Sequence, residues 1–232
     1  MALRFSTTDQ VANNGVKVLV HGFAGVGKTS LCATAPNPVI LSAESGLLSL
    51  RKHSIPVIEI STVEDLMEAH QWALNAAEAA QFQTICIDSI SEIAEVVLAN
   101  AKRQVKDPRA AYGELIEKTM ATIRAFRDLQ GKHVYMAAKM EPFKDETTGI
   151  VRYIASMPGS KLGGQIPYLF DEVFRLGIGK VPTTGQEYRF LQTQPDLQYD
   201  AKDRSGALDA LEPPDLTHIF NKIIGALQNG QS

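Results

Sequence analysis

The octapeptide at residues 22–29 constrains the fold of this chain more than any other feature. It reads Gly-Phe-Ala-Gly-Val-Gly-Lys-Thr, the G-x-x-x-x-G-K-[ST] pattern, and it stands between a β-branched run at 16–21 and a helix-forming stretch. The glycines allow the backbone to fold around a phosphate with its N–H groups pointing inward, and the following helix adds its positive N-terminal end. A glycine-rich turn with an incidental lysine is the alternative interpretation, but it leaves the eight matching positions and both flanks unexplained.

This loop predicts ATP and Mg²⁺ as ligands. We expect Lys28 to reach the β- and γ-phosphates and the Thr29 hydroxyl to ligate Mg²⁺. The residues expected to bind the nucleotide are Gly22, Phe23, Ala24, Gly25, Val26, Gly27, Lys28, Thr29, Ser30 and Asp88.

The rest of the chain alternates short apolar runs with stretches of helical periodicity, which is typical of an α/β fold with a mainly parallel central sheet flanked by helices. Each run is too short for a helix and is apolar enough for a strand that is covered on both faces. The expected strands are 16–21, 39–42, 57–60, 84–88, 133–138, 172–178 and 187–193, and the expected helices are 61–77, opened by a Ser61–Glu64 capping box, 90–100, 111–130 and 216–227.

Length and composition predict one domain. The 232 residues, 44% of them hydrophobic, suffice for one ordinary core, and we place the domain at 16–228 with an arm at 1–15 and a tail at 229–232. No apolar stretch is long enough for a membrane span, and there is no secretory signal pattern. Because the two cysteines also fall in apolar runs, as buried thiols do, we expect a cytoplasmic protein with no membrane partner.

Two carboxylates are candidates for the chemistry at the phosphates. Asp88 ends the apolar run Ile85–Ile87 and is the best candidate to hold the metal, although it also suits a helix N-cap. Glu44 follows the second expected strand, and in open α/β sheets ligands gather at that carboxyl edge. A solvated loop glutamate is the alternative for Glu44.

A phosphate loop, a glutamate after the second strand and an apolar strand ending in Asp-Ser together resemble the RecA-like P-loop ATPases. The likeness is greatest to small phage ATPases, including the single-strand annealing proteins of the Sak group, and it covers about residues 16–224. It includes the stretches LSAESGL, ICIDSI, AYGELI, GSKLGGQIPYLFDEVF and AKDRSG. The resemblance implies a RecA-like core, a bacterial host cytoplasm if a phage encodes the chain, and the role of catalytic base for Glu44.

The resemblance also implies assembly. Lys202 and Arg204, in the AKDRSG stretch, match the K-x-R-x-G element with which RecA-type ring helicases reach the γ-phosphate of a neighbouring subunit. A plain charged turn is the alternative. Lys139 stands where RecA places a polar amide that senses the γ-phosphate, and Phe5 could dock on a neighbour. We therefore expect a homo-oligomer, ring or filament, with ATP between its subunits.

A basic segment at 100–113 suggests binding to single-stranded DNA. It contains four cations and one acid, Asp107, a local charge of +3 in a chain whose net charge is −3. Cations beside an aromatic ring suit phosphates and a base, and RecA-like proteins bind DNA through the corresponding region. A solvated basic helix end is the alternative. The DNA-binding candidates here are Lys102, Arg103, Lys106, Arg109 and Tyr112.

A second candidate DNA-binding segment is the excursion at 140–165, expected to be a flexible loop or a hairpin. Its basic residues Lys144, Arg152 and Lys161 are nearly balanced by acids, so only its position nominates it. It follows the expected sensor strand, where RecA-like folds place their second DNA loop.

These observations favour an ATPase that binds single-stranded DNA and acts in phage-type recombination or annealing, with a single-strand-binding protein as a candidate partner. An ATP-driven motor or helicase-loading factor is a second hypothesis. A nucleotide-gated binding module with little hydrolysis is a third.

Overall fold

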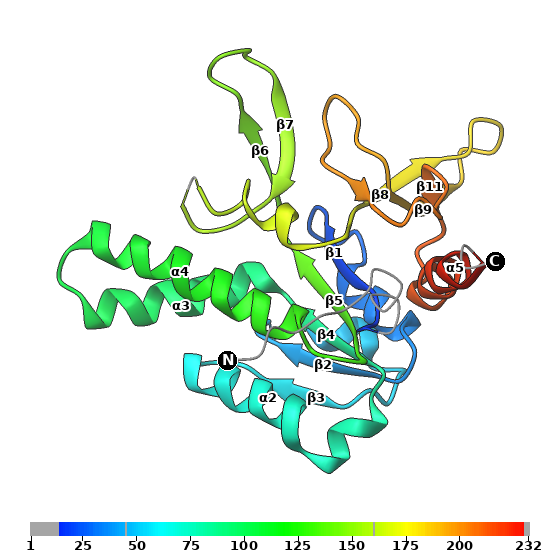
Figure 1. Cartoon of the computed structure of the whole chain (residues 1–232). Helices are drawn as coiled ribbons and strands as arrows, with labels where there is room; N and C mark the ends of the chain where they lie inside the picture. Colours follow the sequence, from blue (N-terminus) through cyan, green and yellow to red (C-terminus); the bar gives the residue numbers. More distant parts are fainter. Residues whose placement is uncertain (1–13, 45, 160, 230–232) are drawn as a thin grey trace.

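The computed structural model describes residues 14–44, 46–159 and 161–229 (Figure 1). Phe5, proposed above as a docking residue, lies outside the described residues, as do most of the predicted arm and tail. Within the described ranges, none of the helices combines the length and the apolarity needed to cross a bilayer.

A nine-stranded, mainly parallel sheet forms the centre of the molecule. Residues 38–42 and 84–88, like residues 17–21 and 133–138, are mostly apolar runs buried on both faces, as a parallel sheet covered by helices requires. In spatial order the strands are β11 (Leu211–Glu212), β9 (Glu187–Gln192), β8 (Glu172–Lys180), β1 (Lys17–His21), β5 (His133–Ala138), β4 (Thr84–Asp88), β2 (Pro38–Ser42) and β3 (Val57–Glu59), with β10 (Lys202–Asp203) paired to β8.

From β8 to β3 the neighbouring strands run parallel, whereas β9, β10 and β11 pair antiparallel. The predicted fold class, a mainly parallel sheet flanked by helices, is therefore confirmed. β5 lies between β1, which leads into the phosphate loop, and β4, which ends at Asp88.

Helices cover both faces of the sheet and divide the core in two. One buried cluster lies under α2 (Val63–Asn75), α3 (Ile90–Gln104) and α4 (Pro108–Arg127). The other lies under α1 (Lys28–Leu31) and α5 (Leu216–Asn229). Both free cysteines are buried, Cys86 in β4 and Cys32 in the 3₁₀ turn after α1.

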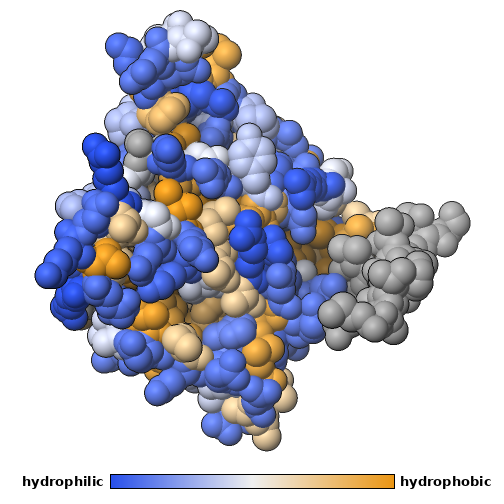
Figure 2. Space-filling model, turned by 60° about the vertical axis from the view of Figure 1, so that its left-hand side comes forward, coloured by the Kyte–Doolittle hydropathy of each residue, from blue (hydrophilic) through white to orange (hydrophobic). Residues whose placement is uncertain are grey.

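Two hairpins project from this core. α3 and α4 form a long antiparallel pair that extends to one side of the sheet, and β6 (Met140–Lys144) and β7 (Val151–Ala155) form a two-stranded ribbon that rises on another side (Figure 1). The segment expected to be a loop or a hairpin is thus a β-hairpin over residues 140–155. On the face of the molecule from which the helical pair projects, hydrophilic side chains are interleaved with apolar ones (Figure 2).

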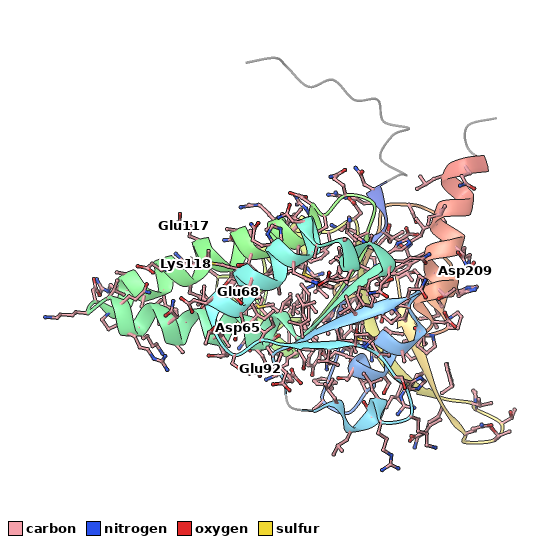
Figure 3. The ribbon with its side chains drawn as sticks, turned by 90° about the horizontal axis from the view of Figure 1, so that it is seen from below. Asp65, Glu68, Glu92, Glu117, Lys118 and Asp209 are labelled. Atoms are coloured by element: carbon pink, nitrogen blue, oxygen red, sulfur yellow. The ribbon has the colours of Figure 1, made fainter. Side chains whose placement is uncertain are left out.

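Several helix boundaries differ from the sequence prediction. The predicted capping box at Ser61 is wrong by one residue, because the Thr62 hydroxyl accepts from the Asp65 N–H while the Asp65 carboxylate accepts from the N–H of Thr62. α3 continues to Gln104 instead of ending at 100, and α4 begins at Pro108, capped by Asp107. Asp65 and Glu92, near the starts of α2 and α3, lie on the same side of the molecule (Figure 3).

Candidate nucleotide-binding site

The phosphate loop joins the end of β1 to α1. Gly25 and Gly27 have φ values of +74° and +110°, in the left-handed region that glycine tolerates and most residues avoid. The Lys28 ammonium folds into the loop and donates to the carbonyl oxygens of Gly22 (2.8 Å) and Phe23 (3.0 Å). α1 has only four residues, so the N–H groups of the loop, more than a long helix dipole, are available to a phosphate.

Thr29 and Asp88 meet directly below this loop. The Thr29 hydroxyl donates to Oδ2 of Asp88 across 2.6 Å. Burial raises the pKa of Asp88, and the hydrogen bond from Thr29 and the nearby Lys28 ammonium oppose that rise. A hydroxyl oxygen beside a buried carboxylate is a donor set that Mg²⁺ prefers, so these two residues fit the predicted ion.

Glu44 lies at the carboxyl end of β2, as the sequence predicts. Its Oε1 accepts a hydrogen bond from the Ser89 hydroxyl (2.7 Å), and its backbone carbonyl accepts one from Ser42 (2.6 Å). These contacts hold the carboxylate beside the end of β4, close enough to Lys28 to oppose the lowering of the lysine pKa that burial causes.

Lys139 lies directly after β5, on the side of the site away from the phosphate loop. Its ammonium pairs with Glu92, and its N–H donates to the Ser91 hydroxyl (2.9 Å). A cavity of about 590 Å³ brings together the loop glycines with Lys28, Thr29, Glu44, Asp88 and Lys139, as well as Ser30, Ser49 and Met140. The residues predicted from three separate strand ends therefore line one cavity.

Residues 14–205, most of the chain, match the AAA domain family AAA_24. The chain belongs to this AAA domain family. With the assembled loop, family membership identifies a P-loop ATPase domain. No curated protein is similar enough in sequence to count as a relative. Among solved structures, a KaiC-like protein of the archaeon Pyrococcus horikoshii is similar at 14% identity and a TM-score of 0.44, over 82% of this chain and 83% of that chain.

Lys202 and Arg204 lie far from the cavity of their own AAA domain. β10 runs antiparallel to β8, so Arg204 reaches the end of the sheet where β1 begins, beside Lys17. The Lys202 ammonium donates to the carbonyl oxygens of Pro167 and Phe170, whereas the Arg204 guanidinium pairs with Asp171 (3.0 Å) at the surface. The structure does not bring these cations to the Lys28 loop of the same chain.

The predicted DNA-binding residues of this AAA domain separate into two groups. Arg109 and Tyr112 of α4 and Lys161 of the loop after β7 line one groove of about 520 Å³. Lys102, in the last turn of α3, places its ammonium 5.8 Å from the centre of the Tyr112 ring. Arg103 and Lys106 are exposed near the tip of the helical pair. Two segments that are about 50 residues apart in sequence thus form one surface.

The other group lies on the β6–β7 hairpin and does not line that groove. Lys144 is exposed at the end of β6, and Arg152 pairs with Asp200. Tyr153, one residue on, stacks on Tyr199 and meets the ring of Phe23 edge-on, with centroids 5.2 and 5.5 Å apart. The half-buried Tyr153 ring therefore packs the hairpin against the phosphate loop.

Sequence reasoning missed one residue at the loop. The Arg189 Nε, on β9, donates to the Val26 carbonyl across 2.8 Å. The contact joins residues 163 positions apart, and no local pattern around Arg189 distinguishes it from other arginines. Only the antiparallel pairing of β8 and β9 brings it there.

Proposed function

We propose that this chain is a Mg²⁺-dependent ATPase that binds single-stranded DNA and acts as an oligomer in phage-type recombination or annealing. The observation that carries the ATPase part is the convergence of Lys28, Thr29, Glu44 and Asp88 on one cavity. A metal held between Thr29 and Asp88 would neutralise phosphate charge.

The chain's own residues supply the remaining chemistry. The Lys28 ammonium exchanges its loop carbonyls for phosphate oxygens, and the loop N–H groups orient the triphosphate. Glu44, oriented by Ser89, accepts the proton of the attacking water. Lys139 supports the developing charge from the end of β5, after its ammonium leaves Glu92.

The groove lined by Arg109, Tyr112 and Lys161 supports the DNA part of the proposal. Cations beside an exposed tyrosine and a glycine-bearing loop can follow a phosphate backbone and stack on a base. The position of Gly159 is consistent with this arrangement, since a Cβ there would lie 3.2 Å from the Tyr112 ring. Its lack of a side chain leaves the ring accessible from the groove.

The location of Arg204 supports action in trans. Its ion pair with Asp171 is exposed on both sides, so the guanidinium can change partners at little cost, whereas the Lys202 ammonium is fixed by two carbonyls. Replacing Arg204 by Ala should lower turnover without lowering stability. Replacing Lys202 should also lower the melting temperature, because it leaves two carbonyl oxygens unpaired.

One experiment tests the proposal. We would measure phosphate release with and without single-stranded DNA over a range of protein concentrations, with electron microscopy of the same mixtures. Stimulation by DNA together with oligomers supports the proposal. ATP binding with no turnover, no stimulation and no oligomer would favour the nucleotide-gated module. Lys28→Ala, which removes the phosphate contact, is the negative control.

A further inference from the structure

Arg189 lies against the outside of the phosphate loop, and most of its hydrogen-bond donors are not used there. Its Nε donates to Val26, and a Cβ on Gly27 would lie 3.4 Å from that same nitrogen. Among the described residues, no carboxylate forms an ion pair with Arg189, and the hydrogen bonds of its guanidinium involve Nε alone. The terminal nitrogens and the flat face of the group remain available.

An exposed isoleucine stands beside this arginine. Ile178 on β8 is paired directly with Arg189 on β9, so both side chains lie on the same face of the sheet. The next pair inward on that face, Leu176 with Leu191, is buried in the core. Ile178 continues this apolar face outward and keeps 45% of its surface exposed.

The strand order gives the direction in which a bound nucleotide must run. The residues for the γ-phosphate end, on β2, β4 and β5, all lie on one side of β1, and β8 lies on its other side. A triphosphate that has its last phosphate at Lys28 and passes the loop at Gly27 leaves on the β8 side. Arg189, which touches Gly27 and Val26, stands where the opposite end of the nucleotide emerges.

We infer that Ile178 and Arg189 form the platform that holds the base of the nucleoside triphosphate, an inference that rests on the ATP binding proposed above. A planar guanidinium stacks on the face of an aromatic base, and an exposed aliphatic side chain provides an apolar surface next to it. The two residues share one face of a β-ribbon, so the platform is rigid. The ligand class is a purine nucleotide, whose two-ring base spans both side chains.

The test compares two probes, ATP and inorganic tripolyphosphate, each with Mg²⁺, by titration calorimetry. Tripolyphosphate has the phosphates and lacks the base. The variants are Arg189→Ala and Ile178→Ser, and the matched control is Tyr188→Ala, which removes an exposed ring from the opposite face of the same ribbon. A melting curve for each variant reports whether loss of the Val26 contact disturbs folding.

We expect Arg189→Ala to weaken ATP binding by roughly tenfold and Ile178→Ser by roughly threefold, with tripolyphosphate affinity within about twofold of wild type. Tyr188→Ala should change neither. If Arg189→Ala loses affinity equally for ATP and tripolyphosphate, Arg189 only supports the loop and the platform is overturned. Unchanged ATP affinity in both variants would also overturn the platform. If the wild-type protein binds tripolyphosphate as tightly as ATP, the platform is overturned but the phosphate site is supported. Protein that binds neither probe overturns the proposed function as well.

Discussion

The Thr29 hydroxyl and the Asp88 carboxylate are 2.6 Å apart and join the start of α1 to the end of β4. The pair brings together two segments that lie 59 residues apart in sequence. Burial raises the pKa of Asp88, and the hydrogen bond from Thr29 lowers it. Every role proposed for this cavity depends on Asp88 being ionised when the metal binds.

Thr29→Ala should weaken Mg²⁺-dependent nucleotide binding by on the order of tenfold or more, because one oxygen ligand is lost. Loss of the hydrogen bond also raises the pKa of Asp88 further, so protons compete better with the metal and the remaining binding shifts to higher pH. Magnesium titrations of nucleotide binding at several pH values measure both effects. Thr29→Ser, which keeps the hydroxyl, should behave like wild type.

Glu44→Gln should lower the rate of ATP hydrolysis by at least about 100-fold while leaving ATP affinity nearly unchanged, because the amide cannot accept a proton from water. Steady-state phosphate release and equilibrium nucleotide binding separate the two effects. Glu68→Gln, on the exposed surface of α2 (Figure 3), is the matched control. If Glu44→Gln turns over at the wild-type rate, Glu44 is not the base.

Replacing Arg109 and Lys161 together by Ala should weaken binding of single-stranded DNA. The slope of log affinity against log salt concentration should become shallower by about 1 to 2 units. Each phosphate contact that is lost means that fewer counterions are released when the DNA binds. Fluorescence anisotropy at four salt concentrations gives the slope. Lys118→Ala, on the same helix but paired with Glu114, is the control, and an unchanged slope in the double variant would remove the groove from the proposal.

Two buried glutamates should give opposite pH effects on stability. Burial, followed by the nearby charge of Asp203, raises the pKa of Glu172 to about 8, so this carboxyl is neutral in the fold at pH 6. In the unfolded chain it ionises near 4.5, so the free energy of unfolding falls as pH rises from about 4.5 to 8. Glu172→Gln should therefore stabilise the protein by on the order of a few kcal/mol at pH 9 and by little at pH 4.

Glu212 is the counterpart. Burial alone would raise its pKa, but hydrogen bonds from Lys222, the Asp209 N–H and His218 lower it overall. Its contribution to stability is present above its unfolded pKa and is lost as pH falls through the folded value. Glu212→Gln should destabilise by roughly 1–3 kcal/mol at neutral pH. Thermal melts of Glu172→Gln and Glu212→Gln from pH 4 to 9 test both predictions. If the change in melting temperature depends on pH in the same way for the two variants, the opposite roles of the two glutamates are refuted.

The sequence predicts the strands and the phosphate loop because the signals for them are local. The apolar run before Asp88 and the glycines around Lys28 define elements without reference to the rest of the chain. β6 and β7 are harder to predict as strands, since Pro142 and the charged residues around it do not alternate in the manner of a half-buried strand. Tertiary pairing makes Arg189 a neighbour of Val26 and brings Arg109 to Lys161, so no single window of sequence contains either contact.

The Ser91 hydroxyl accepts the N–H of Lys139 and donates to the carbonyl of Ser156, and the Ser156 N–H donates back to the carbonyl of Lys139. The strand end that forms the rear wall of the nucleotide cavity is thereby tied to the backbone that leads into the Pro158–Leu162 side of the groove. A displacement on one side must either carry the other side with it or break these hydrogen bonds. The nucleotide cavity and the groove are therefore mechanically linked, through the Ser91 hydroxyl and through the backbone hydrogen bond between Ser156 and Lys139.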